Sequence, residues 1–179
     1  MFPHLAYPRS FAIMLLSAAA LAPFSTTAST PDPVKLAIFD FEFEDMSAAA
    51  EAGEIAAADT QHLAEVTSSV RDLFEKSGRY SLVDVGSAEA AEVKARSLRK
   101  CDGCDAGIAQ QLGAEQSFVG VVKRITRTEY TVRYQIRDAQ TGAVLSSADS
   151  GLRMGADYSW SRGTTRLIKD RLLAKADPQ

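Results

Sequence analysis

Apolar and polar positions repeat with two different periods along residues 34–175. The run from Val34 to Phe43 is apolar on both faces in its first half and alternates in its second half. This pattern predicts one strand, buried at its first end, that puts three aromatic rings on one face, those of Phe39, Phe41 and Phe43. Residues 59–76 repeat apolar side chains every three or four positions, which predicts an amphipathic helix.

In the second half of the chain, two helices are expected before three consecutive strands, and one helix is expected after them. The segment from Glu129 to Asp138 alternates strictly, which is typical of a half-exposed strand, and the turn residues that follow it predict a hairpin. The remaining elements expected are strands at 80–85, 118–125 and 143–150 and helices at 88–98, 101–113 and 158–175.

The predicted order is therefore β-α-β-α-α-β-β-β-α. Early strands separated by helices favour parallel pairing, and three consecutive strands favour an antiparallel meander. The fold class expected is mixed α/β: a single domain over residues 34–175 with a mixed sheet covered by helices. Residues 29–33 would be a leader and residues 176–179 a tail.

Residues 1–28 have the pattern of a secretory signal peptide. Arg9 precedes an apolar run from Phe11 to Phe24, and small polar residues follow it. The run is shorter than the roughly 20 residues that span a bilayer as a helix. We therefore expect export to the periplasm and no transmembrane segment in the mature protein, with an uncleaved membrane anchor as the alternative.

Charge and composition narrow the function classes. The formal net charge of −3 gives no indication of nucleic-acid binding. Beyond residue 28 the chain has one histidine, His62, and it contains no nucleophile elbow, phosphate loop or zinc-protease motif. The sequence predicts no catalytic residues and no cofactor, and it leaves open whether the protein is an enzyme.

Cys101 and Cys104 form the most specific short motif in the sequence. In an oxidising compartment two such cysteines pair, which favours a structural disulfide at the start of a helix. The alternative is a thiol–disulfide redox site, because a helix N-terminus lowers a thiol pKa. A zinc site would need two further ligands.

Three other groups are candidates for contact or binding. The acidic row of Asp40, Glu42 and Glu44 predicts either a solvated strand end or a small-ligand or metal site. The segment with Tyr158, Trp160 and Arg162 has residue types enriched in binding hot spots, but the same residues are common at the start of a helix. Basic residues near the meander predict a solvated face or a docking face for an acidic partner: Lys123, Arg124, Arg127, Arg133 and Arg137.

The stretch from Cys101 to Val122, followed by the hairpin from Ile136 to Ser146, carries a family resemblance. It resembles the small periplasmic α/β domain of the curli-secretion protein CsgG, the N-terminal domain of TolB, and a group of uncharacterised exported bacterial proteins. The resemblance covers residues 34–150 and implies an anticodon-binding-domain-like fold. It also implies work through protein contacts in the cell envelope. The chain lacks a lipidated cysteine, a pore-forming hairpin and a propeller, so pore formation and Tol function do not transfer.

The favoured hypothesis is a non-enzymatic periplasmic interaction or assembly protein whose partners are envelope proteins. One alternative is a redox accessory protein using Cys101 and Cys104, for which the resemblance suggests a periplasmic quinoprotein dehydrogenase system. The other alternative is a small-ligand or metal-binding module.

Overall fold

The computed structural model describes residues 31–47, 57–86, 97–153 and 159–174. All the elements belong to one compact unit that begins at Asp32. In chain order they are β1 (Val34–Ile38), β2 (Glu42–Asp45), α1 (Ala57–Ser77), β3 (Tyr80–Val83), the 3₁₀ turn η2 (Leu98–Lys100), α3 (Cys104–Gln111), β4 (Gln116–Arg124), β5 (Glu129–Asp138), β6 (Val144–Arg153), α4 (Ser159–Ile168) and the π-helical turn η3 (Lys169–Leu173).

The strands form one mixed sheet with the order β3-β1-β4-β5-β6, and β2 pairs with β4 beyond the end of β1. β1 is parallel to β3 and β4, and β2 is parallel to β4. β4, β5 and β6 are antiparallel. The predicted combination of a parallel half and an antiparallel meander is confirmed, and so is the mixed α/β class.

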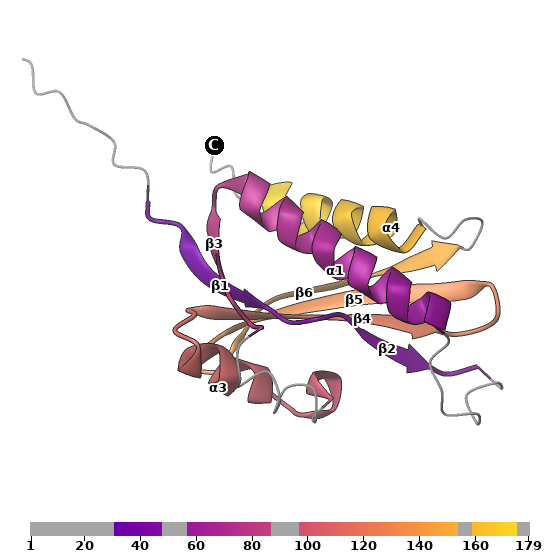
Figure 1. The fold of residues 1–179 in the computed structure, drawn as a ribbon, viewed down its shortest axis with the longest axis horizontal. Helices are drawn as coiled ribbons and strands as arrows, with labels where there is room; N and C mark the ends of the chain where they lie inside the picture. The colour runs from indigo at the N-terminus through magenta and orange to yellow at the C-terminus, as the bar shows by residue number, and fades with distance from the viewer. Residues whose placement is uncertain (1–30, 48–56, 87–96, 154–158, 175–179) are drawn as a thin grey trace, which may run out of the picture. The chain divides into compact units, whose positions relative to one another are not determined.

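Helices lie on both faces of the sheet: α1 and α4 side by side on one face, and α3 on the opposite face (Figure 1). The larger apolar cluster lies under α1 and α4 and includes Phe74, Phe118 and Trp160. A smaller cluster lies under η2 and α3 and includes Leu98 and Ile108. Side chains of β4 alternate between the two clusters, so this strand is buried on both faces.

The first predicted strand is broken, which corrects the expectation of one strand from Val34 to Phe43. Ile38 pairs with Phe118, whereas Glu42 pairs with Val121, so the chain has one residue more than its partner between these pairs. Such a bulge reverses which side chains face which layer. The three phenylalanines therefore do not share a face: Phe39 joins the cluster under α3, and Phe41 and Phe43 join the cluster under α1.

Helix α1 holds this bulge in place. The buried Thr67 hydroxyl accepts a hydrogen bond from the Phe41 N–H at 3.0 Å and donates one to the Leu63 carbonyl at 2.9 Å. One turn later, Arg71 donates to the Ile38 carbonyl at 2.9 Å and to the Asp40 carboxylate at 3.0 Å. Two backbone groups at the bulge, the Phe41 N–H and the Ile38 carbonyl, are thus satisfied by side chains of one helix.

The Phe41 ring lies directly over Gly120 of β4. A Cβ atom at position 120 would lie 2.3 Å from two carbon atoms of that ring. Glycine is therefore required at this position by the approach of the bulge and not by its own backbone conformation.

Other boundaries differ by a few residues. β3 ends at Val83, and β6 continues to Arg153, three residues beyond its predicted end. α3 begins only at Cys104, since Gly103 has a positive φ of 90° that ends the preceding turn. The helix predicted at 88–98 lies outside the described residues except for its last two positions, which belong to or flank η2.

We expect Thr67→Val to lower the free energy of unfolding by about 1–3 kcal/mol, because the isosteric side chain leaves the buried Phe41 N–H without an acceptor. Chemical denaturation measures this difference. The matched control is Thr165→Val, since the Thr165 hydroxyl donates to carbonyls of its own helix alone, 2.8 Å from that of Ser161. Equal losses in the two variants would contradict the role given to Thr67.

Candidate functional site

Cys101 and Cys104 form a disulfide, with their Cα atoms 5.6 Å apart, at the start of α3. The loop that they enclose is fixed to β5, because Arg137 donates to the Asp102 carboxylate at 3.0 Å and to the Gly142 carbonyl at 2.9 Å. One arginine therefore joins the disulfide loop to the hairpin between β5 and β6.

Asp105 lies next to this loop and is a buried charge that the sequence patterns did not single out. It accepts a hydrogen bond from the Ser117 hydroxyl at 2.5 Å, and its carboxylate lies 3.7 Å from the Nε atom of Arg137. The sequence signal was limited to an acidic residue in the first turn of a helix. Its partners on β4 and β5 lie 12 and 32 positions further along the chain.

The three acids of the row pair with three different cations, although Asp40 and Glu42 line one open cavity of about 740 Å³. Asp40 pairs with Arg71 beside α1, whereas Glu44 pairs with Lys123 of β4 at 2.8 Å. Glu42 turns to the other layer and accepts hydrogen bonds from Ser97, Leu98 and Arg99 at the start of η2. Across the described ranges, no group of three or more His, Cys, Asp or Glu side chains is placed to hold a metal ion.

Trp160 is part of the core. It is 2% exposed, and its ring lies 5.3 Å from Tyr130, 5.6 Å from His62 and 5.8 Å from Phe43, measured between centroids. Its burial corrects the idea that the tryptophan itself contacts a partner. Tyr158 lies outside the described residues, while Arg162 is exposed on α4.

The basic residues near the meander divide between the two faces of the sheet. Arg124 faces α1, where it binds Asp45 at 3.0 Å and Asp59 at 2.6 Å. Partial burial lowers the pKa of Arg124, but hydrogen bonds to Tyr130 and Asp59 outweigh that effect and raise the pKa above its ordinary value.

Lys123, Arg133 and Arg137 line an open groove of about 720 Å³ on the opposite face, together with η2 and Cys101. The same groove contains Glu44, Asp102, Asp105 and Asp149, so its charge is mixed. The basic residues of the meander therefore do not form a single positive face, and a docking face for an acidic partner at this groove stays a prediction.

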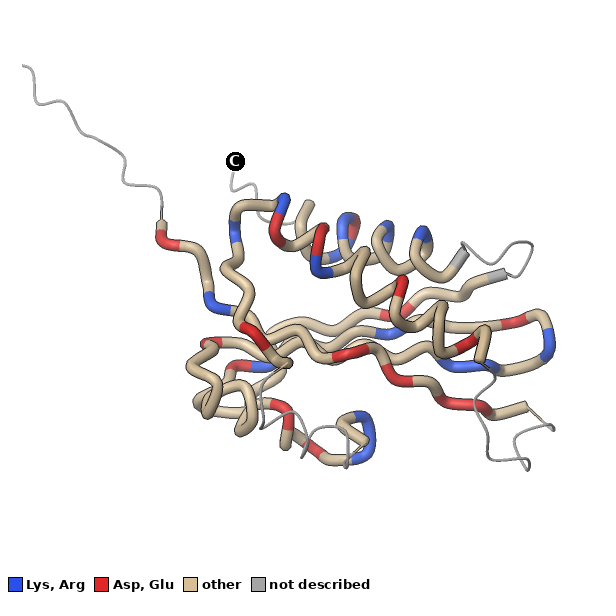
Figure 2. The backbone as a smooth tube through the Cα atoms, in the orientation of Figure 1, with Lys and Arg blue, Asp and Glu red and all other residues tan. Residues whose placement is uncertain are grey.

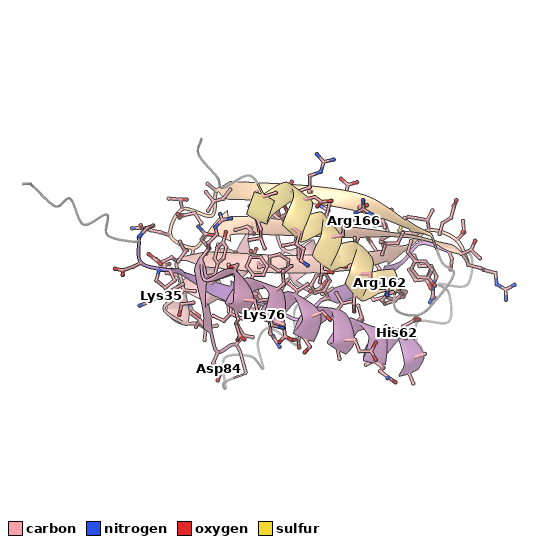
Figure 3. The ribbon with its side chains drawn as sticks, turned by 90° about the horizontal axis from the view of Figure 1, so that it is seen from above. Lys35, His62, Lys76, Asp84, Arg162 and Arg166 are labelled. Carbon is pink, nitrogen blue, oxygen red and sulfur yellow. A yellow bond between two sulfur atoms is a disulfide. The ribbon has the colours of Figure 1, made fainter. Side chains whose placement is uncertain are left out.

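A more uniform positive surface lies on α4 and η3. The buried positions of α4 follow a helical spacing, with Trp160, Thr164, Leu167 and Ile168 facing inward. The outer positions are exposed and carry four cations and one acid; we name them the α4 basic surface, consisting of Arg162, Arg166, Lys169, Asp170 and Arg171. Figure 2 shows these blue positions along α4, and Figure 3 shows Arg162 and Arg166 on it beside α1.

The α4 basic surface contrasts with the rest of the protein. The whole chain has a formal net charge of −3, whereas these five side chains together are positive. Arg166 and Asp170 form an exposed ion pair at 3.6 Å, which contributes little to stability. The spacing of the cations was visible in the sequence, but only Arg162 was chosen as a contact residue.

The chain belongs to the family described as "Protein of unknown function (DUF2380)", whose model matches residues 34–172. Two solved structures have a similar fold with TM-scores of 0.50. The C-terminal domain of LpoB from Salmonella enterica is 16% identical, and the match covers 71% of this chain and 87% of that one. The lipoprotein GNA1162 from Neisseria meningitidis is 13% identical, with 82% and 100% covered.

TolB from Acinetobacter baumannii is also similar, at 18% identity and a TM-score of 0.47, over 85% of this chain and 31% of TolB. The predicted likeness to envelope proteins is thus shown at the level of the fold by the first two structures. The specific likeness to CsgG stays a prediction.

We expect Glu42→Gln to destabilise the protein by about 1.5–3 kcal/mol, because its carboxylate accepts charge-assisted hydrogen bonds at the start of η2. The matched control Glu44→Gln removes one partly exposed ion pair and should cost less than about 1 kcal/mol. Denaturant unfolding gives both values. A loss no larger for Glu42 than for Glu44 would mean that η2 is held by its apolar contacts instead.

Proposed function

We propose that this protein is a non-enzymatic interaction module of the cell envelope, which is exported to the periplasm and docks another envelope protein. The observation that carries the proposal is the α4 basic surface, an exposed group of four cations and one acid on a chain whose net charge is negative. Such a surface steers association with an acidic partner and fixes its orientation.

The rigid placement of α4 supports this proposal. Trp160 anchors the start of the helix among three rings, and Gly163 packs so closely on Leu152 that a Cβ there would lie 2.1 Å from a Leu152 methyl carbon. A partner therefore meets arginine side chains on a fixed backbone, which reduces the ordering cost of binding.

The titratable side chains are held by structural contacts, which favours an interaction function over a catalytic one. Asp40, Glu42 and Glu44 each hold a separate basic partner, and the His62 ring packs against Trp160. These groups stabilise the fold in the arrangement described. In the described part of the chain, no helix is long and apolar enough to cross a membrane.

Export is supported by the signal-peptide pattern of residues 1–28. One protein with this fold, GNA1162, is described as a lipoprotein. The location and the docking role are tested together by site-specific photo-crosslinking in intact cells that produce the full chain.

A photo-reactive residue in place of Arg166 should form an adduct with an envelope protein, and cell fractionation should place that adduct outside the cytoplasm. The matched position is Lys76, which forms a comparable exposed pair with Asp72 on the neighbouring helix. An adduct from position 166 and none from position 76 is the expected result. Absence of adducts from both positions, or an adduct that stays cytoplasmic, would overturn the proposed function.

The redox alternative has one observation in its favour: Cys101 borders the open groove, and its disulfide partner Cys104 is the first residue of α3. In that function the disulfide would accept two electrons and two protons from a partner dithiol. The partner would become oxidised to a disulfide while Cys101 and Cys104 became thiols.

The reduction potential of the pair separates the two functions. We expect a value below about −300 mV, which is typical of structural disulfides. The double Cys→Ser variant should then lose stability, because the loop would no longer be closed. A potential between about −120 and −200 mV with unchanged stability would establish the redox function instead.

A further inference from the structure

We propose that the free edge of β6 binds an extended acidic segment of the partner protein as an added strand, beside the α4 basic surface. This inference rests on the proposed function and specifies its binding mode. Strand addition to an open sheet edge is a common way for proteins to recognise an extended peptide.

β6 is the outermost strand on its side of the sheet and pairs only with β5 among the described elements. It has ten residues, whereas β2 and β3 at the other side have four each, and β2 carries three acidic side chains. Short or charged edges resist pairing with other chains. From Val144 to Leu152, β6 has one charge and no proline or lysine, and its one register irregularity lies at its start, between Val144 and Ser146. The edge from Ser146 to Leu152 therefore lacks that protection.

Backbone groups of β6 that point away from β5 can be identified from the pairing. At the hairpin the Asp138 N–H donates to the Ala143 carbonyl. Directions alternate along an antiparallel pair, so every second residue from Asp138 faces β6. Their partners turn inward: Ser146, Ala148, Ser150 and Leu152. Ser147, Asp149 and Gly151 therefore present their N–H and carbonyl groups outward.

Exposed apolar side chains mark the start of the same edge. Val144 and Leu145 are 48% and 52% exposed, among the few large apolar residues that the described chain leaves in solvent. An added strand would cover part of this surface, which contributes apolar burial to a contact otherwise made by the backbone.

Charge selects the chemistry of the added strand. Because Gly163 packs on Leu152, α4 lies over β6. A strand about 4.8 Å further out would point every second side chain toward the layer of α4. Carboxylates at those positions would meet the field of the α4 basic surface. The positions between them would lie on the face of Asp149, where uncharged side chains fit better.

A second copy of this chain is a poorer occupant. Antiparallel pairing of β6 with β6 of another copy places both α4 helices on the same face, next to the shared edge. Two surfaces of like charge would then lie side by side, and such a juxtaposition is destabilising. The structure thus favours an acidic segment of a different protein.

The probe is a fluorescein-labelled peptide about as long as β6 that alternates Glu with Thr and Val, with a Lys-for-Glu peptide as its matched counterpart. Fluorescence anisotropy on the mature protein should show at least about tenfold tighter binding of the Glu peptide. At saturation, amide hydrogen exchange at Ser147, Asp149 and Gly151 should slow, while exchange in β3 should not change.

Two variants test the two parts of the contact. Ser147→Pro removes an outward N–H and leaves the ladder to β5, so it should weaken binding about tenfold or more. Arg166→Glu should weaken binding of the Glu peptide through charge alone, and its matched control Lys76→Glu should not. Circular dichroism verifies that each variant is folded. If Ser147→Pro is unfolded, the comparison of Arg166→Glu with Lys76→Glu, together with amide exchange in the unmodified protein, tests the contact.

Equal binding of both peptides, or unchanged exchange at the three amides, would overturn the strand-addition inference. Protection of these amides in the protein alone, together with a dimer in sedimentation, would overturn it in favour of a second copy. If crosslinking from position 166 succeeds in cells while these tests fail, the proposed function stands without this binding mode.

Discussion

The contact of Phe41 with Gly120, held by Thr67, determines how the two layers are built on the sheet. The one-residue bulge between β1 and β2 sends Phe41 and Phe43 toward α1 and turns Glu42 toward η2. Without it, Glu42 would point into the apolar layer, where an unpaired carboxylate is costly. The bulge therefore makes both the larger core and the anchoring of η2 possible.

Long periodic segments made most of the fold predictable, while the bulge was hidden by repetition. The residues from Phe39 to Phe43 alternate strictly, as they would in an unbroken strand. The sequence therefore contains no sign of the extra residue that the structure shows there. The strand predicted at 118–125 did imply that the neighbouring residues Lys123 and Arg124 point to opposite faces. Treating them as one basic patch ignored that period.

The candidate site was harder to predict because it depends on contacts distant in sequence. Glu42 and Leu98 are 56 positions apart, and no local pattern couples them. An aromatic residue at a helix start is equally compatible with a core anchor and with a contact residue, so the burial of Trp160 required the positions of Phe43 and Tyr130. Arg162 was predictable as an exposed residue because the helical period separates it from the buried positions.

The distribution of ion pairs explains why a positive surface remains on α4. All three acidic side chains of β2 are matched to cations on other elements, and Asp59 of α1 shares Arg124 with Asp45. Four cations and one acid are exposed on α4 and η3, and the layer beneath the helix is filled largely by apolar groups. Stability does not require this excess, since exposed charges contribute little to folding. A charge surplus on a rigid helix, beside an unprotected strand edge, is better explained by association than by the needs of the fold.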